Sequence, residues 1–159
     1  MTYDAVIDPS GLYRYSLTRR WGIGTPNRVC FMMLNPSTAN ASADDPTIRR
    51  CIGFAKRWGH DSLEVVNVFA LRTSDPAKLL LSNNPLGMNN HAYIQEAFVF
   101  AEKIVVAWGA SVSVVSWLPR HIMADHKHKL FCLGLTKTGH PRHPLYVKAD
   151  TELIHYELP

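Results

Sequence analysis

Hydrophobic side chains occur in short runs that are separated by polar turns containing proline or glycine. Residues 12–21 alternate between apolar and polar positions, which predicts a half-buried strand. After a turn at residues 22–27, the continuous apolar run of residues 29–34 predicts a buried strand that ends at Asn35-Pro36. We expect these two consecutive strands to pair as a hairpin.

A helix is predicted after the small-residue loop at residues 37–43. Asp44-Asp45-Pro46 offers a carboxylate to cap free backbone amides and a proline for the first helical position. Apolar side chains then recur every three or four residues, which gives the helix one face for packing on a sheet. These side chains are Ile48, Cys51, Ile52, Ala55 and Trp58. Gly59 is expected to end the helix.

Predicted strands and helices alternate through the remainder of the chain. Strands are expected at residues 63–71, 104–107 and 130–135, helices at residues 91–102 and 111–123, and an edge strand within residues 146–159. A short helix is expected to begin at Asp75-Pro76, before a loop at residues 82–90. The alternation favours an α/β fold, a three-layer sandwich with a mostly parallel central sheet. With no repeat or linker, residues 1–159 are expected to form a single domain.

The composition is that of an ordinary globular domain, with 47% hydrophobic and 19% charged residues. No apolar run approaches the roughly 20 residues that span a bilayer, so no membrane association is expected. The first ten residues carry acidic residues and proline where a secretory signal would be basic and then apolar, which favours a cytoplasmic location. The net charge of +4 permits a polyanionic partner without requiring one. A monomer is the favoured oligomeric state.

The cysteines and histidines give no metal or disulfide signature. Cys30, Cys51 and Cys132 are widely spaced and are expected to be reduced, with Cys30 and Cys132 acting as small buried hydrophobes. A metal site or a solvated surface would each fit the cluster His121, Asp125, His126 and His128, and its charged context favours the surface. Motifs for phosphate-binding loops, serine nucleophiles and zinc proteases are absent. No cofactor or metal is therefore expected.

Polar, glycine-bearing or aromatic segments follow each predicted parallel strand. These segments are residues 35–38, 72–75, 108–109 and 136–144. In open α/β sheets, ligands bind beyond the carboxyl ends of the strands. We therefore expect these segments to converge on one cleft that presents amide, hydroxyl, cationic and imidazole groups.

Five strings resemble, in this order, an uncharacterised bacterial and phage family whose domain has no known function. They are FMMLNPSTA, DDPTIRRCIGFAKRWG, VVNVFALR, VVAWG and TKTGHPRHPLY. The resemblance covers about residues 27–153 and supplies no reaction.

A more distant resemblance links the chain to the uracil-DNA glycosylase superfamily. It is carried by an apolar strand followed by Asn35-Pro36, a strand with Asn67, a strand ending in Trp-Gly, and a final His-Pro segment. The resemblance implies that superfamily's fold and hydrolysis of a base–sugar bond without a metal. On this mapping Asn35 positions water and His143 stabilises the leaving base, while Leu145 or Tyr146 takes the place of the wedge inserted into a duplex. The sequence departs from the pattern because it lacks glycines around Asn35 and has Leu-Tyr after His143-Pro144 where Ser-Pro is expected.

The chemistry of base release fits these residue types. Positive charge develops on the sugar and negative charge on the base, so a site needs a water acceptor on one side and hydrogen-bond donors on the other. Asn35 can orient water, and His143, or else His140, can donate to the base. A base held in a duplex must first be extruded, and aromatic rings can stack on it afterwards. The expected substrate-binding residues are Pro36, Ser37, Asn67, Trp108, Lys137, His140, Arg142 and Tyr146.

Several of these residues also have structural interpretations. Asp45 is either a helix cap or a carboxylate that positions water, and Asn67 is either a buried anchor or a base-reading amide. The basic residues Arg49, Arg50 and Arg72 either track phosphates or only face solvent.

The leading hypothesis is a glycosylase-like hydrolase, an N-glycosidase of DNA repair or modification that acts on a nucleobase in DNA or a nucleotide. Its catalytic residues would be Asn35, His143 and Asp45. The alternatives are a non-catalytic module that binds nucleic acid or nucleotides, and a small-molecule hydrolase or transferase that uses the same cleft.

Overall fold

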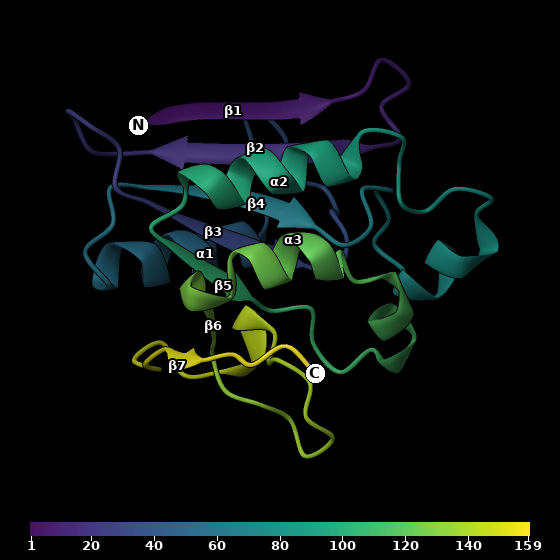
Figure 1. The fold of residues 1–159 in the computed structure, drawn as a ribbon. Coiled ribbons are helices and arrows are strands. Elements are labelled where there is room, and N and C mark those ends of the chain that lie inside the picture. Colours follow the sequence, from purple (N-terminus) through teal and green to yellow (C-terminus); the bar gives the residue numbers. More distant parts are fainter.

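The computed structural model describes residues 1–159 except for the side chain of Val112. One seven-stranded sheet has the strand order β1-β2-β4-β3-β5-β6-β7 (Figure 1). Its strands are β1 (Thr2–Ile7), β2 (Arg14–Arg20), β3 (Arg28–Met33), β4 (Ser62–Asn67), β5 (Lys103–Val106), β6 (Leu130–Cys132) and β7 (Ile154–His155). The α-helices are α1 (Pro46–Arg57), α2 (Asn90–Phe100) and α3 (Arg120–Asp125). Short 3₁₀ helices cover Pro76–Leu81, Val112–Trp117, Lys127–Lys129 and Pro144–Tyr146.

The sheet is mixed, so the expectation of a mostly parallel sheet is wrong. Strands β4, β3, β5 and β6 run parallel to one another, whereas β1, β2 and β7 are joined through antiparallel pairs. The expected hairpin between β2 and β3 is also wrong, because β4 lies between these strands. Strand β2 instead forms a hairpin with β1, an edge strand whose weak apolar pattern gave no signal.

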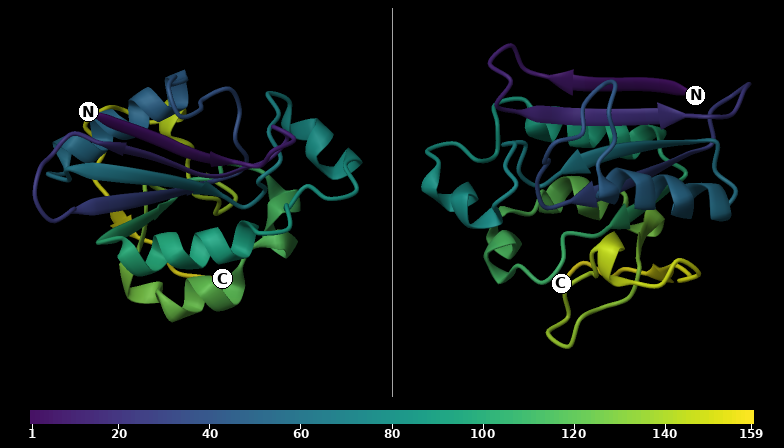
Figure 2. Two further views of the ribbon diagram at one scale, coloured as in Figure 1. Left: turned by 90° about the horizontal axis from the view of Figure 1, so that it is seen from above. Right: turned by 180° about the vertical axis from the view of Figure 1, so that it is seen from behind.

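Helices cover both faces of the sheet, which gives three layers (Figure 2). Strand β3 is the centre of the core because its side chains are buried alternately on the two faces. Val29, Phe31 and Met33 pack with α1. Cys30 and Met32 face the cluster that includes side chains of α2 and α3. Because both faces of β3 are buried, its sequence is a continuous apolar run.

Helix α1 begins and ends where its local sequence predicts. Asp45 is the N-cap, and its Oδ1 accepts a hydrogen bond of 2.8 Å from the backbone N–H of Ile48. Pro46 occupies the first turn, and Gly59 adopts a positive φ of 84° just beyond the helix. The capping interpretation of Asp45 is therefore confirmed.

The segment expected as one helix at residues 111–123 is divided in two. A 3₁₀ helix at Val112–Trp117 precedes α3, and Pro119 stands at the N-cap of α3. Proline lacks the amide hydrogen that a continuous helix would need, and the valines in this segment disfavour helix. The strand expected at residues 63–71 is shorter, because β4 ends at Asn67.

All three cysteines are free and buried. Burial raises the pKa of the Cys30, Cys51 and Cys132 thiols, so they stay protonated and are poor nucleophiles. Among the described residues, no helix combines the length and the apolar character that a membrane span requires.

The topology places a crevice between β3 and β5. These neighbouring parallel strands lead to helices on opposite faces, since α1 follows β3 and α3 follows β5. The chain therefore diverges at their carboxyl ends, and ligands of open α/β sheets bind at such switch points.

Candidate functional site

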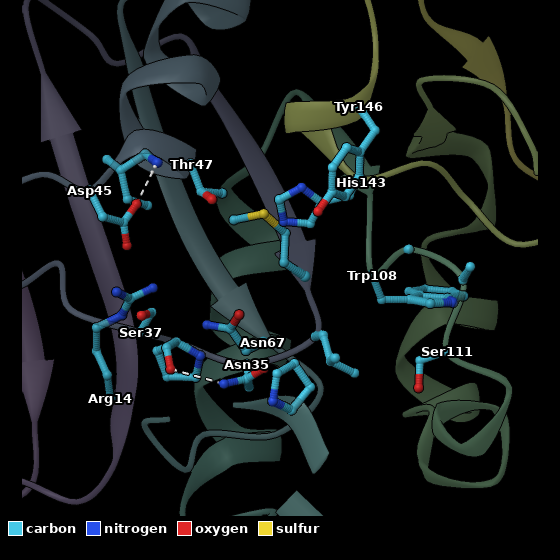
Figure 3. A pocket seen from close by; sticks show the side chains of 17 residues that line it. Arg14, Asn35, Ser37, Asp45, Thr47, Asn67, Trp108, Ser111, His143 and Tyr146 are labelled. Carbon is cyan, nitrogen blue, oxygen red and sulfur yellow. Dashed lines mark hydrogen bonds between the residues drawn. The ribbon is translucent and has the colours of Figure 1, made fainter. Parts of the chain in front are cut away.

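A cavity of about 400 Å³ opens at this crevice. Its wall is formed by the segments that follow β3 and β5, the start of α1, the start of β2, the end of β4, and the 3₁₀ helix Pro144–Tyr146 (Figure 3). The polar residues in the wall are Arg14, Asn35, Ser37, Asp45, Thr47, Asn67, Ser111, His143 and Tyr146. The volume lies within the range of about 300–1,000 Å³ that is typical of small-molecule sites.

The structure brings Asn35 and His143 to the same cavity, although 107 positions separate them in the sequence. Hydrogen bonds between loops hold this arrangement. The backbone N–H of Gly109 donates to the carbonyl of Pro141 over 2.9 Å, which ties the segment after β5 to the His-Pro segment. Gly109 has a φ of 80°, a left-handed conformation that glycine adopts without strain.

The side-chain amide of Asn35 is oriented by backbone carbonyls. Its Nδ2 donates to the carbonyl of Thr73 over 2.8 Å and to that of Pro36 over 3.0 Å. Because a carbonyl can only accept a hydrogen bond, the amide atom that contacts both carbonyls is the nitrogen. Oδ1 is then the atom that is left to accept a hydrogen bond. Asn35 can therefore accept a hydrogen bond from water or a ligand in the cavity.

The imidazole of His143 is arranged as a neutral donor. Its Nδ1 accepts a hydrogen bond of 3.2 Å from the backbone N–H of Leu145, so the ring proton is on Nε2. Burial lowers the pKa of His143, and the carboxylate of Asp45 only partly opposes this effect. At neutral pH the ring is therefore uncharged and offers its Nε2–H as a donor.

Arg50 holds the segment that carries His143. Its Nε donates to the carbonyl of Pro144 over 3.2 Å, and its Nη2 donates to the carbonyl of Val147. The guanidinium also lies over the ring of Phe54 at 5.6 Å. These bonds fasten the 3₁₀ helix Pro144–Tyr146 to α1 and occupy the side chain that was expected to contact nucleic acid.

The other two expected nucleic-acid contacts also lie outside the cavity. Arg49 donates from Nη1 to the carbonyl of Asp44 and, with Arg50 and Arg57, lines a separate groove on α1. Arg72 donates from Nη1 to the carbonyl of Gly11.

Asp45 combines its capping role with a position in the cavity wall. Its Oδ1 is used by the helix cap, whereas Oδ2 forms no hydrogen bond with a described residue. The two interpretations of this residue are thus compatible, because one oxygen stabilises the helix and the other remains available to a ligand.

Asn67 lies at the centre of the cavity (Figure 3). The residue is only 1% exposed, and both amide atoms, Oδ1 and Nδ2, are buried without a hydrogen-bond partner among the described residues. The backbone around it is firmly held, because Nδ2 of Asn90 donates to the carbonyls of Asn67 and Val68. The fold therefore uses neither atom of this amide, and both remain available to a ligand in the cavity.

Two aromatic side chains border the cavity on its other sides. Trp108 is almost fully buried and packs edge-to-face on Tyr156. Tyr146 is 79% exposed and lies beside His143, with 5.6 Å between ring centroids. Trp108 is thus part of the core with one part facing the cavity, whereas Tyr146 stands at the entrance.

Pro36 and Ser37 line the cavity as expected, but Lys137, His140 and Arg142 do not. The chain from residues 134 to 142 folds back on itself as a small hairpin. The backbone N–H of Thr136 donates to the carbonyl of His140, and that of Arg142 donates to the carbonyl of Gly134. Lys137 lies at the tip of this hairpin, outside the cavity wall. Nε of Arg142 donates to the carbonyl of Leu135. Of this basic segment, only the portion from His143 onward reaches the site.

Sequence reasoning missed Arg14, Thr47 and Ser111. Arg14 comes from the start of β2, which lies at the carboxyl end of β4 because these two strands are antiparallel. The sequence predicted a cleft built from the segments that follow strands, so the start of β2 gave no candidate.

Among the described side chains, no group of three or more His, Cys, Asp or Glu is placed to hold a metal ion. The residues His121, Asp125, His126 and His128 thus form no such group.

The structure is that of a mixed α/β protein with a polar cavity at the switch point of its sheet. The chain belongs to the family described as "Protein of unknown function (DUF1643)", whose family model matches residues 14–145. Neither the search of curated proteins nor the search of solved structures gave a significant match.

Proposed function

We propose that the protein is a glycosylase-like hydrolase that binds a nucleobase in the cavity and cleaves its bond to the sugar. The observation that carries this proposal is the unpaired amide of Asn67 at the cavity centre. An amide presents one donor and one acceptor side by side. Nucleobase edges present the complementary pair, and enzymes that bind flipped bases recognise them by hydrogen bonds to that edge.

His143 supplies the donor for the leaving base. As the base–sugar bond breaks, its electron pair moves onto the base, and negative charge develops on the base oxygen. A neutral imidazole with Nε2–H facing this oxygen stabilises that charge without itself losing the proton. The base then takes up a proton from solvent.

Asn35 and Asp45 act on the attacking water. Oδ1 of Asn35 orients the water, whose oxygen forms the new bond to the sugar carbon. An amide is too weak a base to take the proton, so the free oxygen of Asp45 accepts it. The Asp45 carboxylate also stabilises the positive charge that develops on the sugar.

Aromatic residues and sequence resemblance give further support. Trp108 in the wall and Tyr146 at the entrance can contact the face of a base or its neighbour, and base–aromatic stacking is worth about 1–3 kcal/mol. The resemblance of the Asn35 and His143 segments to the uracil-DNA glycosylase superfamily points to the same reaction. A glycosylase-like fold is part of this proposal.

The test is release of base from a substrate panel. Purified protein is incubated with single- and double-stranded DNA that carries uracil or other modified bases, and with the corresponding nucleosides and nucleotides. Abasic sites and free base are then quantified. We expect release from at least one substrate, and no release from any of them would contradict the proposal. Binding without release would instead support the alternative of a non-catalytic module.

A matched pair of variants links activity to the cavity. Asn67→Asp replaces the donor half of the amide edge with a second acceptor and should lower release by about ten- to hundredfold. Asn83→Asp makes the same chemical change at an exposed position and should leave release unchanged. If the two variants released base at the same rate, Asn67 would have no role in the reaction.

A further inference from the structure

Arg14 is a buried cation whose hydrogen-bonding capacity is largely unused. Its side chain is 2% exposed and lines the cavity. Nη1 donates to the carbonyl of Ala39 over 3.1 Å, and Nε is buried without a partner among the described residues. Nη2 forms no hydrogen bond with a described residue, and Arg14 forms no ion pair with any of them. A guanidinium offers five donors in a planar fork, so most of this fork is free.

A β-bulge turns Arg14 toward the cavity. Leu17 packs on the α1 face of the sheet, while Ser16 bonds to Glu64 and Tyr15 stacks on Tyr93 of α2, both on the other face. Two adjacent residues thus face the same side, at the point where the register between β1 and β2 shifts. Regular alternation would have turned Arg14 away from α1. Bulges of this kind re-aim side chains next to binding sites.

Charges of both signs lie around Arg14. Arg19 is neutralised by Asp44, with 2.8 Å between Nε and Oδ1. Arg72 lies close enough to lower the pKa of Arg14, whereas the carboxylate of Asp45 raises it. Burial is the strongest influence and lowers the pKa of Arg14 to about 10, so the side chain remains charged at neutral pH. In the cavity wall itself, Arg14 carries the positive charge and Asp45 the negative one, while Arg72 lies outside the cavity.

We propose that the ligand of this cavity carries an oxyanion, either a phosphate or a carboxylate, and that Arg14 binds it through its free guanidinium edge. Arg14 and Asn67 line the same cavity (Figure 3), so a ligand in it can contact both buried side chains. Planar bidentate bonding makes arginine the preferred partner of phosphate and carboxylate. This inference rests on the proposed function for the base and adds that the substrate is a nucleotide or a carboxylated nucleobase.

Binding to the wild-type protein is the primary test. Affinities are measured calorimetrically for uridine and the four deoxynucleosides, for their 5′-monophosphates, for 5-carboxylated pyrimidine nucleosides, and for inorganic phosphate. We expect an oxyanion to tighten binding by about ten- to hundredfold, which is the contribution of a hydrogen bond to a charged group. Tighter binding of the monophosphates identifies a phosphate, and tighter binding of the carboxylated nucleosides identifies a carboxylate.

Variants assign the effect to Arg14. Arg14→Met should abolish the advantage of the anionic ligand, and Arg14→Lys, which keeps the charge but loses the fork, should restore part of it. Arg57→Gln removes an exposed positive charge from α1, outside the cavity, and should leave the advantage intact. Thermal unfolding checks that each variant folds, and the wild-type comparison does not depend on either Arg14 variant.

The outcomes separate this inference from the proposed function. Equal affinity of neutral and anionic ligands, or an anionic advantage that survives in Arg14→Met, would overturn the role of Arg14 and leave base hydrolysis standing. Binding of inorganic phosphate through Arg14 without any affinity for nucleosides or nucleotides would support the oxyanion site and contradict the nucleobase proposal. No binding of any ligand would overturn the inference.

Discussion

The two ends of β4 differ in whether the buried polar side chain there is hydrogen-bonded within the protein. Near the amino end, Glu64 is 8% exposed, and its carboxylate accepts a hydrogen bond of 2.6 Å from Ser16 and one of 3.0 Å from Arg28. Three residues later, at the carboxyl end, Asn67 is 1% exposed and neither amide atom is paired. The same strand thus carries one satisfied and one unsatisfied buried polar group.

The difference lies in what each side chain faces. Glu64 is enclosed by partners from β2 and β3, so its polarity is used within the fold. Asn67 faces the cavity, where Arg14 is also largely unpaired. Most buried polar groups in proteins are hydrogen-bonded, and an exception that lines a cavity is a candidate for binding a ligand. The carboxyl end of β4 therefore leaves an amide available to a ligand, whereas the carboxylate of Glu64 is used within the fold.

The largest expected effect is on catalysis at the carboxyl end. Asp45→Asn should lower base release by roughly 10²–10⁴-fold, because an amide cannot accept the proton from water. Asparagine caps helices as well as aspartate does, so the thermal stability should hardly change. Single-turnover assays and thermal unfolding measure the two quantities. Undiminished release would remove Asp45 from the proposed mechanism.

A stability comparison along β4 should give the next largest effect. Glu64→Ala leaves Ser16 and Arg28 without their acceptor and should lower the free energy of unfolding by about 2 kcal/mol, less than for a fully buried pair. Asn67→Ala deletes an unsatisfied group and should leave stability unchanged or raise it. Chemical denaturation of both variants tests the contrast, and equal destabilisation would mean that Asn67 has an internal structural role.

A smaller effect is expected from the side chain that positions His143. Arg50→Lys keeps the charge but cannot hold both carbonyls in the same geometry, so base release should fall by about tenfold. The acid limb of the pH–rate profile should also move, because the environment of the His143 imidazole changes. Arg49→Lys is the matched control on α1. If Arg50→Lys lost stability but kept the wild-type pH–rate profile, Arg50 would have only a structural role.

The smallest effect concerns pH. Burial lowers the pKa of His143 below its ordinary value of 6.5, so the unfolded chain binds this proton more readily than the folded chain. The contribution to stability is therefore complete above pH 6.5 and is lost as the pH falls toward the lower folded value. His143→Gln should reduce the acid-induced fall in melting temperature. If the melting temperature of His143→Gln fell with decreasing pH as steeply as that of the wild type, burial would not lower the pKa of His143.

Local signals in the sequence predicted the elements that depend on neighbouring residues. The start of α1 follows from Asp45-Pro46, and the buried strand β3 follows from its continuous apolar run. Pairing between distant strands has no such signal. Strand β4 inserts between β2 and β3 through contacts that are far apart in the sequence, so the expected hairpin was wrong.

The same limit applies to the site. Asn35 and His143 could be nominated because each follows a predicted strand, and the sheet topology brings both to the cavity. Arg14 could not, because its orientation depends on a bulge that reverses the alternation of β2 and that has no signal in the sequence. Lys137 and Arg142 were nominated by type, but the fold-back of residues 134–142 directs them elsewhere.

The most direct test of the central claim follows the side chains of Asn67 and Arg14 in the wild-type protein by NMR. Nucleosides and nucleoside 5′-monophosphates are titrated into ¹⁵N-labelled protein, with Nδ2 of Asn67 assigned from Asn67→Asp and Nε of Arg14 from Arg14→Lys. We predict that a bound monophosphate shifts both resonances while Nδ2 of Asn90, which is already bonded, stays unchanged. Saturable binding that leaves the Asn67 and Arg14 resonances in place would contradict a ligand site at the carboxyl end of the sheet.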